Sequence, residues 1–262
     1  MSSFVDIHCH LLPGIDDGAA DLAASLAMAR LQVASGVSHV VVTPHQLGAF
    51  AHNEGDAIRT ATTALQAEFD KQEIPLRVSP GADVRIEDGM MEKLDSGEVL
   101  SLGDHQRHVL LELPHELYFP LEPVLDGLAQ RGMVGVLSHP ERNAGLLKEP
   151  SLIEPLVEAG CLMQVTAGSL LGAFGSSSQA MAESMAKAGL IHFLATDAHS
   201  PRRRKPALGE AMTRAADLVG EPAARLWCDD YPAAVAAGQD VPAGRVRVTP
   251  PRRGWSLWRR SA

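Results

Sequence analysis

Short apolar runs alternate with amphipathic helical stretches along most of the chain, and this alternation limits the fold more than any other feature. Several runs are almost continuous in Val, Ile and Leu, as strands buried on both faces of a parallel sheet or barrel are. The stretches between them, such as residues 22–33 and 117–128, keep one face apolar and predict covering helices. The expected strands occupy residues 4–8, 37–43, 76–84, 108–114, 133–139, 161–167 and 190–199.

Glycines mark the ends of four expected helices. Gly36, Gly132, Gly160 and Gly189 each stand directly before an apolar run, where a left-handed backbone conformation suits glycine. The last three recur at intervals of 28 and 29 residues, which is the size of one helix and strand unit. A chain of 262 residues built from such units fits one barrel domain. An α/β fold is therefore expected.

The composition is that of a protein without export signals. Apolar residues make up 45% of the chain, but no run approaches the roughly 18 unbroken apolar residues of a membrane span. The N-terminus lacks a basic segment followed by a long apolar stretch. Cys9, Cys161 and Cys228 are widely spaced, which argues against a disulfide framework, and none begins a Cys-x5-Arg phosphatase loop. A cytoplasmic protein without a transmembrane segment is expected.

The formal net charge of −9 is unevenly distributed. Residues 245–262 contain six arginines and no acidic residue, so removing these six charges leaves −15 for residues 1–244. A body this acidic is not expected to bind nucleic acid. The division predicts a barrel domain over residues 1–244 and a basic, flexible tail over residues 245–262. The tail also contains two tryptophans, so docking to an acidic membrane surface or a partner protein stays open.

Residues able to bind metal stand at the ends of most expected strands. His8 and His10 flank Cys9, and alternation along a strand directs both imidazoles to one face. Carboxyl ends of barrel strands converge on one mouth, and so many acidic groups together would repel one another without cations. The constellation therefore predicts metals. The other strand-end residues are His45, Asp83, Glu112, His139, Asp197 and His199, and Asp16 and Asp17 follow the first strand in a glycine-flanked loop.

The motifs resemble a known family. "DIHCHLLPGIDDGA", "TPH", "LLELP", "SHPERN", "QVTAGSLLGAFG" and "TDAH" occur in an order and spacing similar to those of the polymerase and histidinol phosphatase (PHP) superfamily. More narrowly, they resemble its bacterial manganese-dependent protein-tyrosine phosphatase branch, which accompanies capsule and exopolysaccharide tyrosine kinases. The resemblance runs from about Phe4 to about Arg225. It implies a PHP fold, which is a distorted (β/α)7 TIM-like barrel.

The resemblance also implies three metal sites and a phosphate clamp. Two positions depart from this branch: Asp83 stands where it usually has Glu, which shortens the reach of the bridge, and Gln46 replaces a histidine often found after "TPH". Arg142 and Arg204 match the positions that hold the phosphate. The implied ligands are His8, His10 and Asp197 for one ion, Asp83 as a bridge to a second ion held by Glu112 and His139, and Asp17, His45 and His199 for a third.

The implied reaction is phosphomonoester hydrolysis. A hydroxide bridging two cations would attack phosphorus while the metals and arginines neutralise the oxygens. Manganese is implied as the cofactor, and iron or zinc also suits nitrogen and oxygen donors without thiolate. The implied substrate is a phosphotyrosine protein, such as a membrane tyrosine autokinase. Its phenolate leaving group has a conjugate pKa near 10, so strong general-acid help is less necessary.

Three alternatives remain open at the level of sequence. The same fold could serve a small-molecule phosphatase, such as a histidinol-phosphate phosphatase. An amidohydrolase barrel also begins with His-x-His, but it commonly needs a bridging lysine where Glu112 stands. From another class, a non-catalytic metal-binding module could dock a membrane kinase through the basic tail. A complete set of ligands argues against that last reading.

Overall fold

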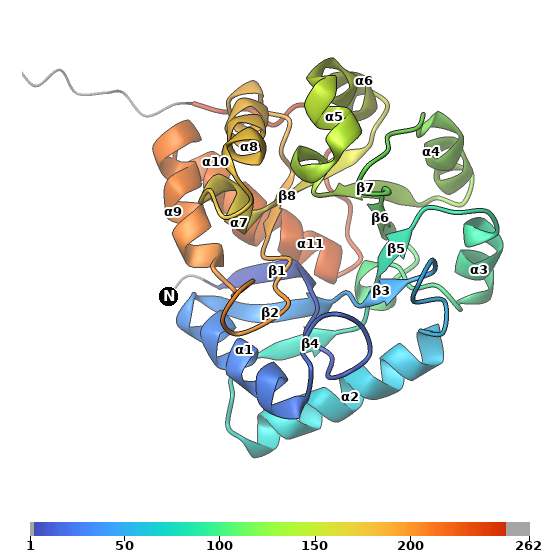
Figure 1. The fold of residues 1–262 in the computed structure, drawn as a ribbon, viewed down its shortest axis with the longest axis vertical. Coiled ribbons are helices and arrows are strands. Elements are labelled where there is room, and N and C mark those ends of the chain that lie inside the picture. The colour runs from blue at the N-terminus through green and yellow to red at the C-terminus, as the bar shows by residue number, and fades with distance from the viewer. Residues whose placement is uncertain (1–2, 250–262) are drawn as a thin grey trace, which may run out of the picture.

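The computed structural model describes residues 3–249 and shows an α/β fold with parallel strands (Figure 1). Within these residues, nine strands form a three-stranded sheet of order β1-β2-β4 and a six-stranded sheet of order β3-β5-β6-β7-β8-β9. The expected α/β fold is confirmed. The strands are β1 Phe4–Cys9, β2 Val37–Val42, β3 His45–Gln46, β4 Arg77–Ser79, β5 Asp83–Arg85, β6 His108–Glu112, β7 Val134–Ser138, β8 Leu162–Thr166 and β9 Phe193–Ala195.

Prolines explain why two sheets are found where the sequence predicts one run of seven strands. Pro44 separates β2 from β3, and Pro80 separates β4 from β5. Proline has no N–H to donate to a ladder, so pairing stops at both positions and resumes beyond them. The prediction of one continuous strand over residues 76–84 was therefore wrong. The last strand is also shorter than expected, because the chain leaves the sheet after Ala195.

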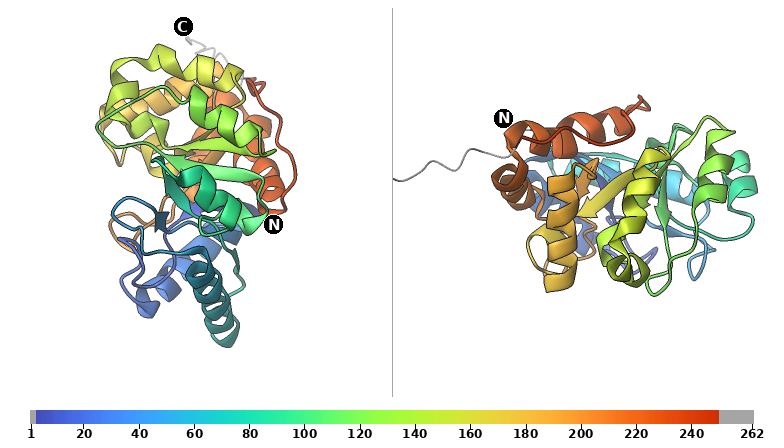
Figure 2. Two further views of the ribbon diagram at one scale, coloured as in Figure 1. Left: turned by 90° about the vertical axis from the view of Figure 1, so that its right-hand side faces the viewer. Right: turned by 90° about the horizontal axis from the view of Figure 1, so that it is seen from above.

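Helices lie around the outside of the strands in views from the side and from above (Figure 2). Asp21 begins α1 by accepting a hydrogen bond from the Ala24 N–H at 2.8 Å. The longer helices are α1 Leu22–Ala34, α2 Gly55–Lys71, α4 Glu122–Ala129, α8 Ser176–Ala188 and α9 Leu208–Val219, and the shorter ones are α3 Met90–Ser96, α5 Ala144–Lys148, α6 Ile153–Glu158, α7 Ala167–Leu170, α10 Glu221–Arg225 and α11 Tyr231–Ala236.

The helix ends follow the sequence in most places. Gly36, Gly132, Gly160 and Gly189 all have positive φ, as their positions predicted. The helix expected over residues 117–128 is wrong at its start, since α4 begins only at Glu122 and the Leu117 side chain is exposed. Pro120 disfavours a helical conformation at Phe119, so the helix does not extend back to Leu117.

Two apolar clusters form the core. The larger lies between the strands and the surrounding helices and contains residues such as Met28, Ile58 and Leu208. The smaller joins inward-facing residues of several strands, such as Ile7, Leu110 and Phe193, to Val235 of α11. The Ala236 carbonyl of α11 lies 3.1 Å from Nε2 of His105, which precedes β6, so α11 lies at the amino end of this strand. The carboxyl ends of the strands lie on the opposite side, where functional residues are expected in this type of fold.

The described part of the tail lies against the body. The Val246 N–H donates to the Gly189 carbonyl at 2.8 Å, and the Thr249 N–H donates to the Val219 carbonyl at 3.2 Å. Residues 250–262, which hold most of the expected basic tail, lie outside the described residues. Over residues 3–249, no helix is both long enough and apolar enough to cross a membrane.

Candidate metal centre

A bulge in β1 turns two histidines toward the same point. Asp6 pairs with Val40 and Cys9 with Val42, so three residues of β1 advance against two of β2. Such a bulge re-aims side chains. Ile7 therefore faces the inner apolar cluster, while the Nε2 atoms of His8 and His10 approach to 3.2 Å.

Each of these imidazoles is oriented by a partner on its other nitrogen. The Nδ1 of His8 lies 2.8 Å from Oε1 of Gln164 on β8, and the Nδ1 of His10 lies 2.7 Å from Oδ2 of Asp16. These acceptors hold the proton on Nδ1 of each neutral ring, so that each Nε2 lone pair would face a bound metal. Gln164 was missed at the level of sequence, because only the sheet order brings it beside His8.

The loop that carries Asp16 and Asp17 folds back over the strand ends. Gly18 permits this approach, since a Cβ at that position would lie 2.4 Å from the Cβ of His10. Asp16 accepts hydrogen bonds from the N–H groups of Gly18 and His45, so its role is to hold the loop and His10 in place. Asp17 instead points its carboxylate at the histidines.

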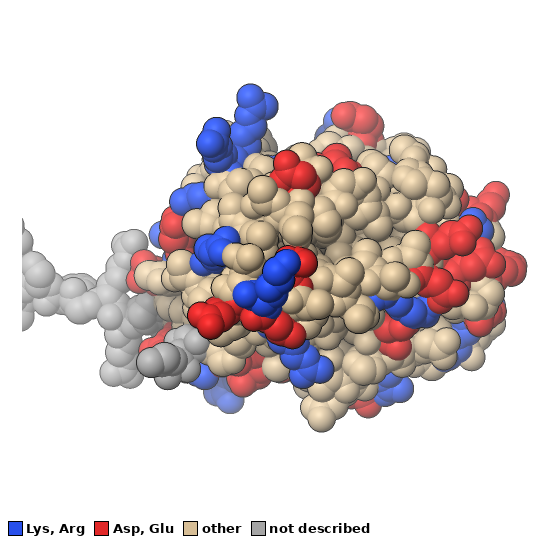
Figure 3. Space-filling model, turned by 90° about the horizontal axis from the view of Figure 1, so that it is seen from below, with Lys and Arg blue, Asp and Glu red and all other residues tan. Residues whose placement is uncertain are grey.

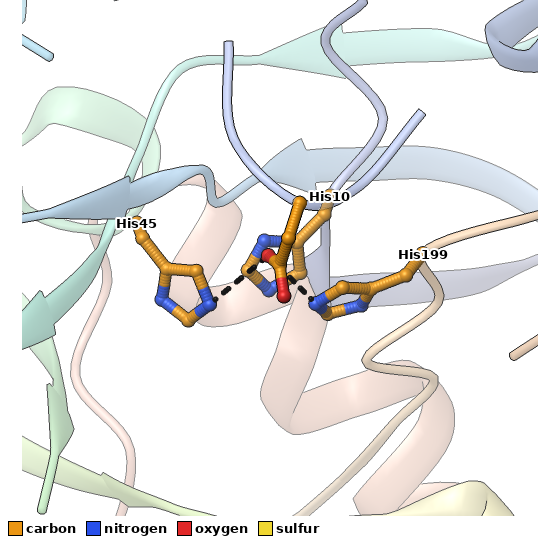
Figure 4. A group of neighbouring side chains, drawn as sticks. His10, His45 and His199 are labelled. Atoms are coloured by element: carbon orange, nitrogen blue, oxygen red, sulfur yellow. Dashed lines mark ion pairs between the residues drawn. The ribbon is translucent and has the colours of Figure 1, made fainter. Parts of the chain in front are cut away.

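The rings of His10, His45 and His199 lie around one point (Figure 4), and the Asp17 carboxylate lies among them. Its Oδ1 lies 3.4 Å from Nε2 of His199 and 3.5 Å from Nε2 of His45. The rings of His10 and His199 lie with their centroids 3.8 Å apart. These four residues place one ligand atom each within 4.8 Å of one another. They come from the first loop, from β3, and from the segment after β9.

Asp197 connects the histidines to two arginines. Its Oδ1 lies 3.3 Å from Nε2 of His8 and 3.5 Å from Nε2 of His10. Its Oδ2 accepts hydrogen bonds from both Arg142 and Arg204. The backbone at Asp197 has φ of 49°, a left-handed conformation that aspartate tolerates better than most residues. One carboxylate thus faces both the ligand cluster and the guanidinium groups.

Asp83 lies between two groups of possible ligands. Its Oδ2 is 3.5 Å from Nε2 of His8 and 3.5 Å from Nδ1 of His45, and neither carboxylate oxygen has a hydrogen-bond partner within residues 3–249. Glu112 lies 3.6 Å from Nδ1 of His45, whereas it is 4.0 Å from Nε2 of His139. A buried carboxylate without hydrogen bonds is costly unless a cation satisfies it.

The structure brings together all nine residues that the sequence predicted as metal ligands. They form overlapping groups, in which Glu112 and His139 each lie with Asp83 and are 4.0 Å from one another. Assignment of ligands to particular ions stays a prediction. The groups are His8, His10 and Asp197; His8, Asp83 and His139; His45, Asp83 and Glu112; and His10, Asp17, His45 and His199.

The charge of the carboxylates is balanced in part by His8 and His10, the two imidazoles of the cluster whose pKa is raised. Although burial opposes it, Asp16 and Asp197 raise the pKa of His10 to about 10. Burial also opposes ionisation of Asp83, but the neighbouring imidazole of His8 lowers the pKa of that carboxyl group. Burial and the Asp83 carboxylate raise the pKa of Glu112. Divalent cations would take over this balancing role and leave the imidazoles neutral as ligands.

An aromatic ring and a buried carboxylate position the two arginines. The Cζ of Arg142 lies 4.2 Å from the ring centroid of Phe174, and the Cζ of Arg204 lies 5.9 Å from it. The preceding residue, Glu141, is fully buried and accepts hydrogen bonds from the Ser169 hydroxyl at 2.6 Å and the Thr166 N–H at 3.1 Å. Phe174 and Glu141 belong to the quoted motifs, but the sequence did not indicate these roles.

Known proteins with a similar sequence identify the family. A model of the family described as "Capsular polysaccharide synthesis, CpsB/CapC" matches residues 4–235. The chain belongs to this family. The tyrosine-protein phosphatase YwqE of Bacillus subtilis is 40% identical over 210 residues, which cover 79% of this chain and 82% of that protein. The tyrosine-protein phosphatase CpsB of Streptococcus pneumoniae is 26% identical over 243 residues, which cover 90% and 99%.

Solved structures agree with this placement in the CpsB/CapC family. One similar chain comes from the crystal structures of YwqE from Bacillus subtilis and CpsB from Streptococcus pneumoniae, which are described as unique metal-dependent tyrosine phosphatases. It matches with a TM-score of 0.87 and 35% identity, and the match covers 93% of this chain and 99% of that chain. Molinate hydrolase matches with a TM-score of 0.55 and 14% identity over 95% of this chain and 76% of that chain, which shows the fold alone.

Replacing Gln164 with leucine is expected to weaken metal binding about 10- to 100-fold, because His8 loses the acceptor that fixes its proton and ring orientation. In the described part of the chain the Nε2 of Gln164 has no hydrogen-bond partner, so leucine removes no other side-chain hydrogen bond there. The measurement is activity as a function of added manganese. Gln164→Glu restores an acceptor and should recover most of the affinity. An unchanged metal dependence in the leucine variant would contradict this role.

Proposed function

We propose that this chain is a metal-dependent protein-tyrosine phosphatase. The observation that carries the proposal is Asp197, whose carboxylate faces His8 and His10 through one oxygen and Arg142 and Arg204 through the other. Metal ligands and anion-binding arginines thus share one mouth. The membership in the CpsB/CapC family and the activity named for YwqE support the same reaction.

The donor set fits divalent cations. His8, His10 and Asp197 place their facing atoms 3.2 to 3.5 Å apart, and ligands bound at about 2.1 Å to one ion are separated by about 3.0 to 3.5 Å. Imidazole and carboxylate donors without thiolate suit manganese, iron or zinc, and oxygen-rich positions favour manganese. We propose up to three manganese ions, with the nine clustered residues as ligands and Asp83 as the bridge.

Different residues of the chain would bind the metals, hold the phosphoryl group and orient the ligands. Bound cations supply Lewis-acid charge and a nucleophile derived from water at neutral pH. Arg142 and Arg204 would hold the equatorial oxygens of the phosphoryl group, because a planar guanidinium donates two parallel hydrogen bonds to such oxygens. Gln164 and Asp16 keep His8 and His10 in the tautomer that binds metal. The cations and the two arginines would then stabilise the negative charge that develops on the phosphoryl oxygens in the transition state.

Space beside the cluster suits an aromatic phosphate. A cavity of about 320 Å³ opens next to His45 and Glu112 and is lined also by Phe50 and Arg85. The Phe50 ring stacks on His45 with centroids 5.3 Å apart and an interplanar angle of 19°. We propose a phosphotyrosine protein as substrate, specifically a membrane tyrosine autokinase of capsule or exopolysaccharide synthesis. The three cysteines are free and buried, which suits the cytoplasmic location that we propose.

Removing metal is expected to abolish hydrolysis of a phosphotyrosine peptide, and manganese should restore it, because Asp83 and its neighbours cannot position a nucleophile without cations. Release of inorganic phosphate is measured from the full chain before chelation, after chelation, and after addition of manganese. A parallel assay uses histidinol phosphate. Phosphate release that is unchanged after chelation, or a strong preference for histidinol phosphate over the phosphotyrosine peptide, would contradict the proposal.

We further infer that the two sheets are parts of one distorted (β/α)7 barrel. With β2 and β3 counted as one interrupted strand, and β4 and β5 as another, residues 3–249 contain seven strands. An isolated bridge between Cys9 and Ala198 joins the segment after the last strand to the first strand. Inward-facing residues of β1, β2, β6, β7, β8 and β9 meet in one apolar cluster, which supports closure. We propose residues 1–244 as the barrel domain and residues 245–262 as a basic tail.

A further inference from the structure

A second pocket lies beside the metal centre and takes no part in the ligand groups. It has a volume of about 230 Å³ and is enclosed between the segment after β9 and the segment around α7. Leu171, Ala173 and Phe174 supply apolar walls, while Arg202, Arg203 and Lys205 supply cations. The combination suits a side chain that has an apolar stem and an anionic end.

The pocket and the metal centre share two residues. Arg204 lines the pocket and also donates to Asp197, and Phe174 lines the pocket while packing against Arg142 and Arg204. A group bound in the pocket would therefore be separated from a phosphoryl group on the arginines by little more than one side chain. That spacing is within reach of a neighbouring residue on the same polypeptide.

The charge of this segment is opposite to that of the body. Residues 202–205 are four consecutive cations, whereas residues 1–244 as a whole carry a net −15. Arg204 is bonded to Asp197, and Lys205 lies 3.4 Å from Glu210. Arg202 and Arg203 are exposed, and neither has an ion-pair partner among residues 3–249. Two guanidinium groups thus remain available to an anion that enters the pocket.

Basic side chains are not gathered in this way everywhere on the surface. On the face seen from below, Lys and Arg side chains are scattered among Asp and Glu and form no continuous band (Figure 3). A local group of cations at the edge of a mouth concentrates the attraction for anions there. The pocket next to the mouth is therefore suited to recognise part of the substrate rather than to attract polyanions in general.

We propose that this pocket is a subsite for an anionic side chain flanking the phosphotyrosine of the substrate. The ligand is a carboxylate or a second phosphoryl group, held by the forked donors of Arg202 and Arg203, with its stem on the apolar walls. The proposal rests on the proposed phosphatase function and adds a preference among its substrates. Electrostatic contacts of this kind set specificity and capture of the substrate more than turnover.

The test compares four substrates with the metal-loaded full chain. Three are phosphotyrosine peptides with neutral flanks, glutamate flanks, or a second phosphotyrosine, and the fourth is p-nitrophenyl phosphate. The anionic flanks should raise kcat/KM about fivefold to tenfold, mainly through a lower KM. The double variant Arg202→Gln and Arg203→Gln should lose this preference and hydrolyse p-nitrophenyl phosphate normally. The larger of the two flank effects identifies the anion.

Arg30→Gln provides a matched control, because Arg30 is an exposed arginine on α1 whose Nη2 contacts Gln72. It should retain the preference for anionic flanks. Equal kcat/KM for neutral and anionic peptides, or a preference that survives in the double variant, would overturn the subsite. Fluorescently labelled versions of the same peptides measure binding to the chelator-treated full chain without turnover. The peptides with anionic flanks should bind more tightly than the neutral one. Failure to hydrolyse p-nitrophenyl phosphate with manganese would instead refute the phosphatase function.

Discussion

Replacing Asp197 with asparagine is expected to lower kcat/KM for a phosphotyrosine peptide by at least about 10³-fold and to reduce the bound metal. Its Oδ1 faces the Nε2 atoms of His8 and His10, so replacing the carboxylate with a neutral amide removes a charged metal ligand. Its Oδ2 holds both Arg142 and Arg204, so the guanidinium groups also lose the anchor that orients them. One substitution therefore impairs the two halves of the site.

Asparagine is chosen because the fold should survive the change. The residue has φ of 49°, where asparagine is tolerated but alanine is strained. Metal content by elemental analysis, kcat/KM and thermal unfolding are measured together. Asp95→Asn is the control, because it removes a carboxylate that pairs with Arg131 on the surface. Near-normal metal content and turnover in Asp197→Asn would show that this residue is not at the centre of the site.

The periodicity of the sequence was enough to predict the fold class but not the hydrogen-bonding pattern. Apolar runs buried on both faces located the strands, and glycines such as Gly36 located helix ends. The division into two sheets depends on Pro44 and Pro80, whose missing N–H groups interrupt runs that remain apolar in sequence. Leu117 keeps helical spacing, yet Pro120 prevents the helix from including it. Hydrophobic patterns do not register such local backbone constraints.

The candidate ligands were predictable because parallel strands end at one mouth, so that strand-end residues such as His45 and Asp83 meet whatever their separation in sequence. Residues that act through other residues were not predictable in this way. Gln164 reaches His8 only because β8 faces the β1 bulge across the mouth, and Phe174 reaches Arg142 only through the turn after α7. These contacts depend on side-chain directions that a single sequence does not specify.

Replacing Arg142 with lysine is expected to lower kcat/KM about 10²-fold while leaving the bound metal unchanged. Lysine keeps the positive charge but lacks the planar fork that would bind two phosphoryl oxygens and stack on Phe174. Arg142 is 12% exposed and follows Glu141, whose buried hydrogen bonds keep the loop in place. The loss should therefore come from the clamp rather than from misfolding.

Measuring bound metal and turnover together distinguishes an arginine that binds phosphate from a residue that binds metal. Arg142→Lys should retain its metal by elemental analysis and lose kcat/KM, whereas Asp197→Asn should lose both. Arg131→Lys serves as the control, because the guanidinium of Arg131 pairs with Asp95 away from the mouth. If Arg142→Lys hydrolyses the phosphopeptide at the normal rate, a point charge suffices at this position and the bidentate clamp is refuted. Loss of metal together with activity would instead place Arg142 among the residues that support the ligands.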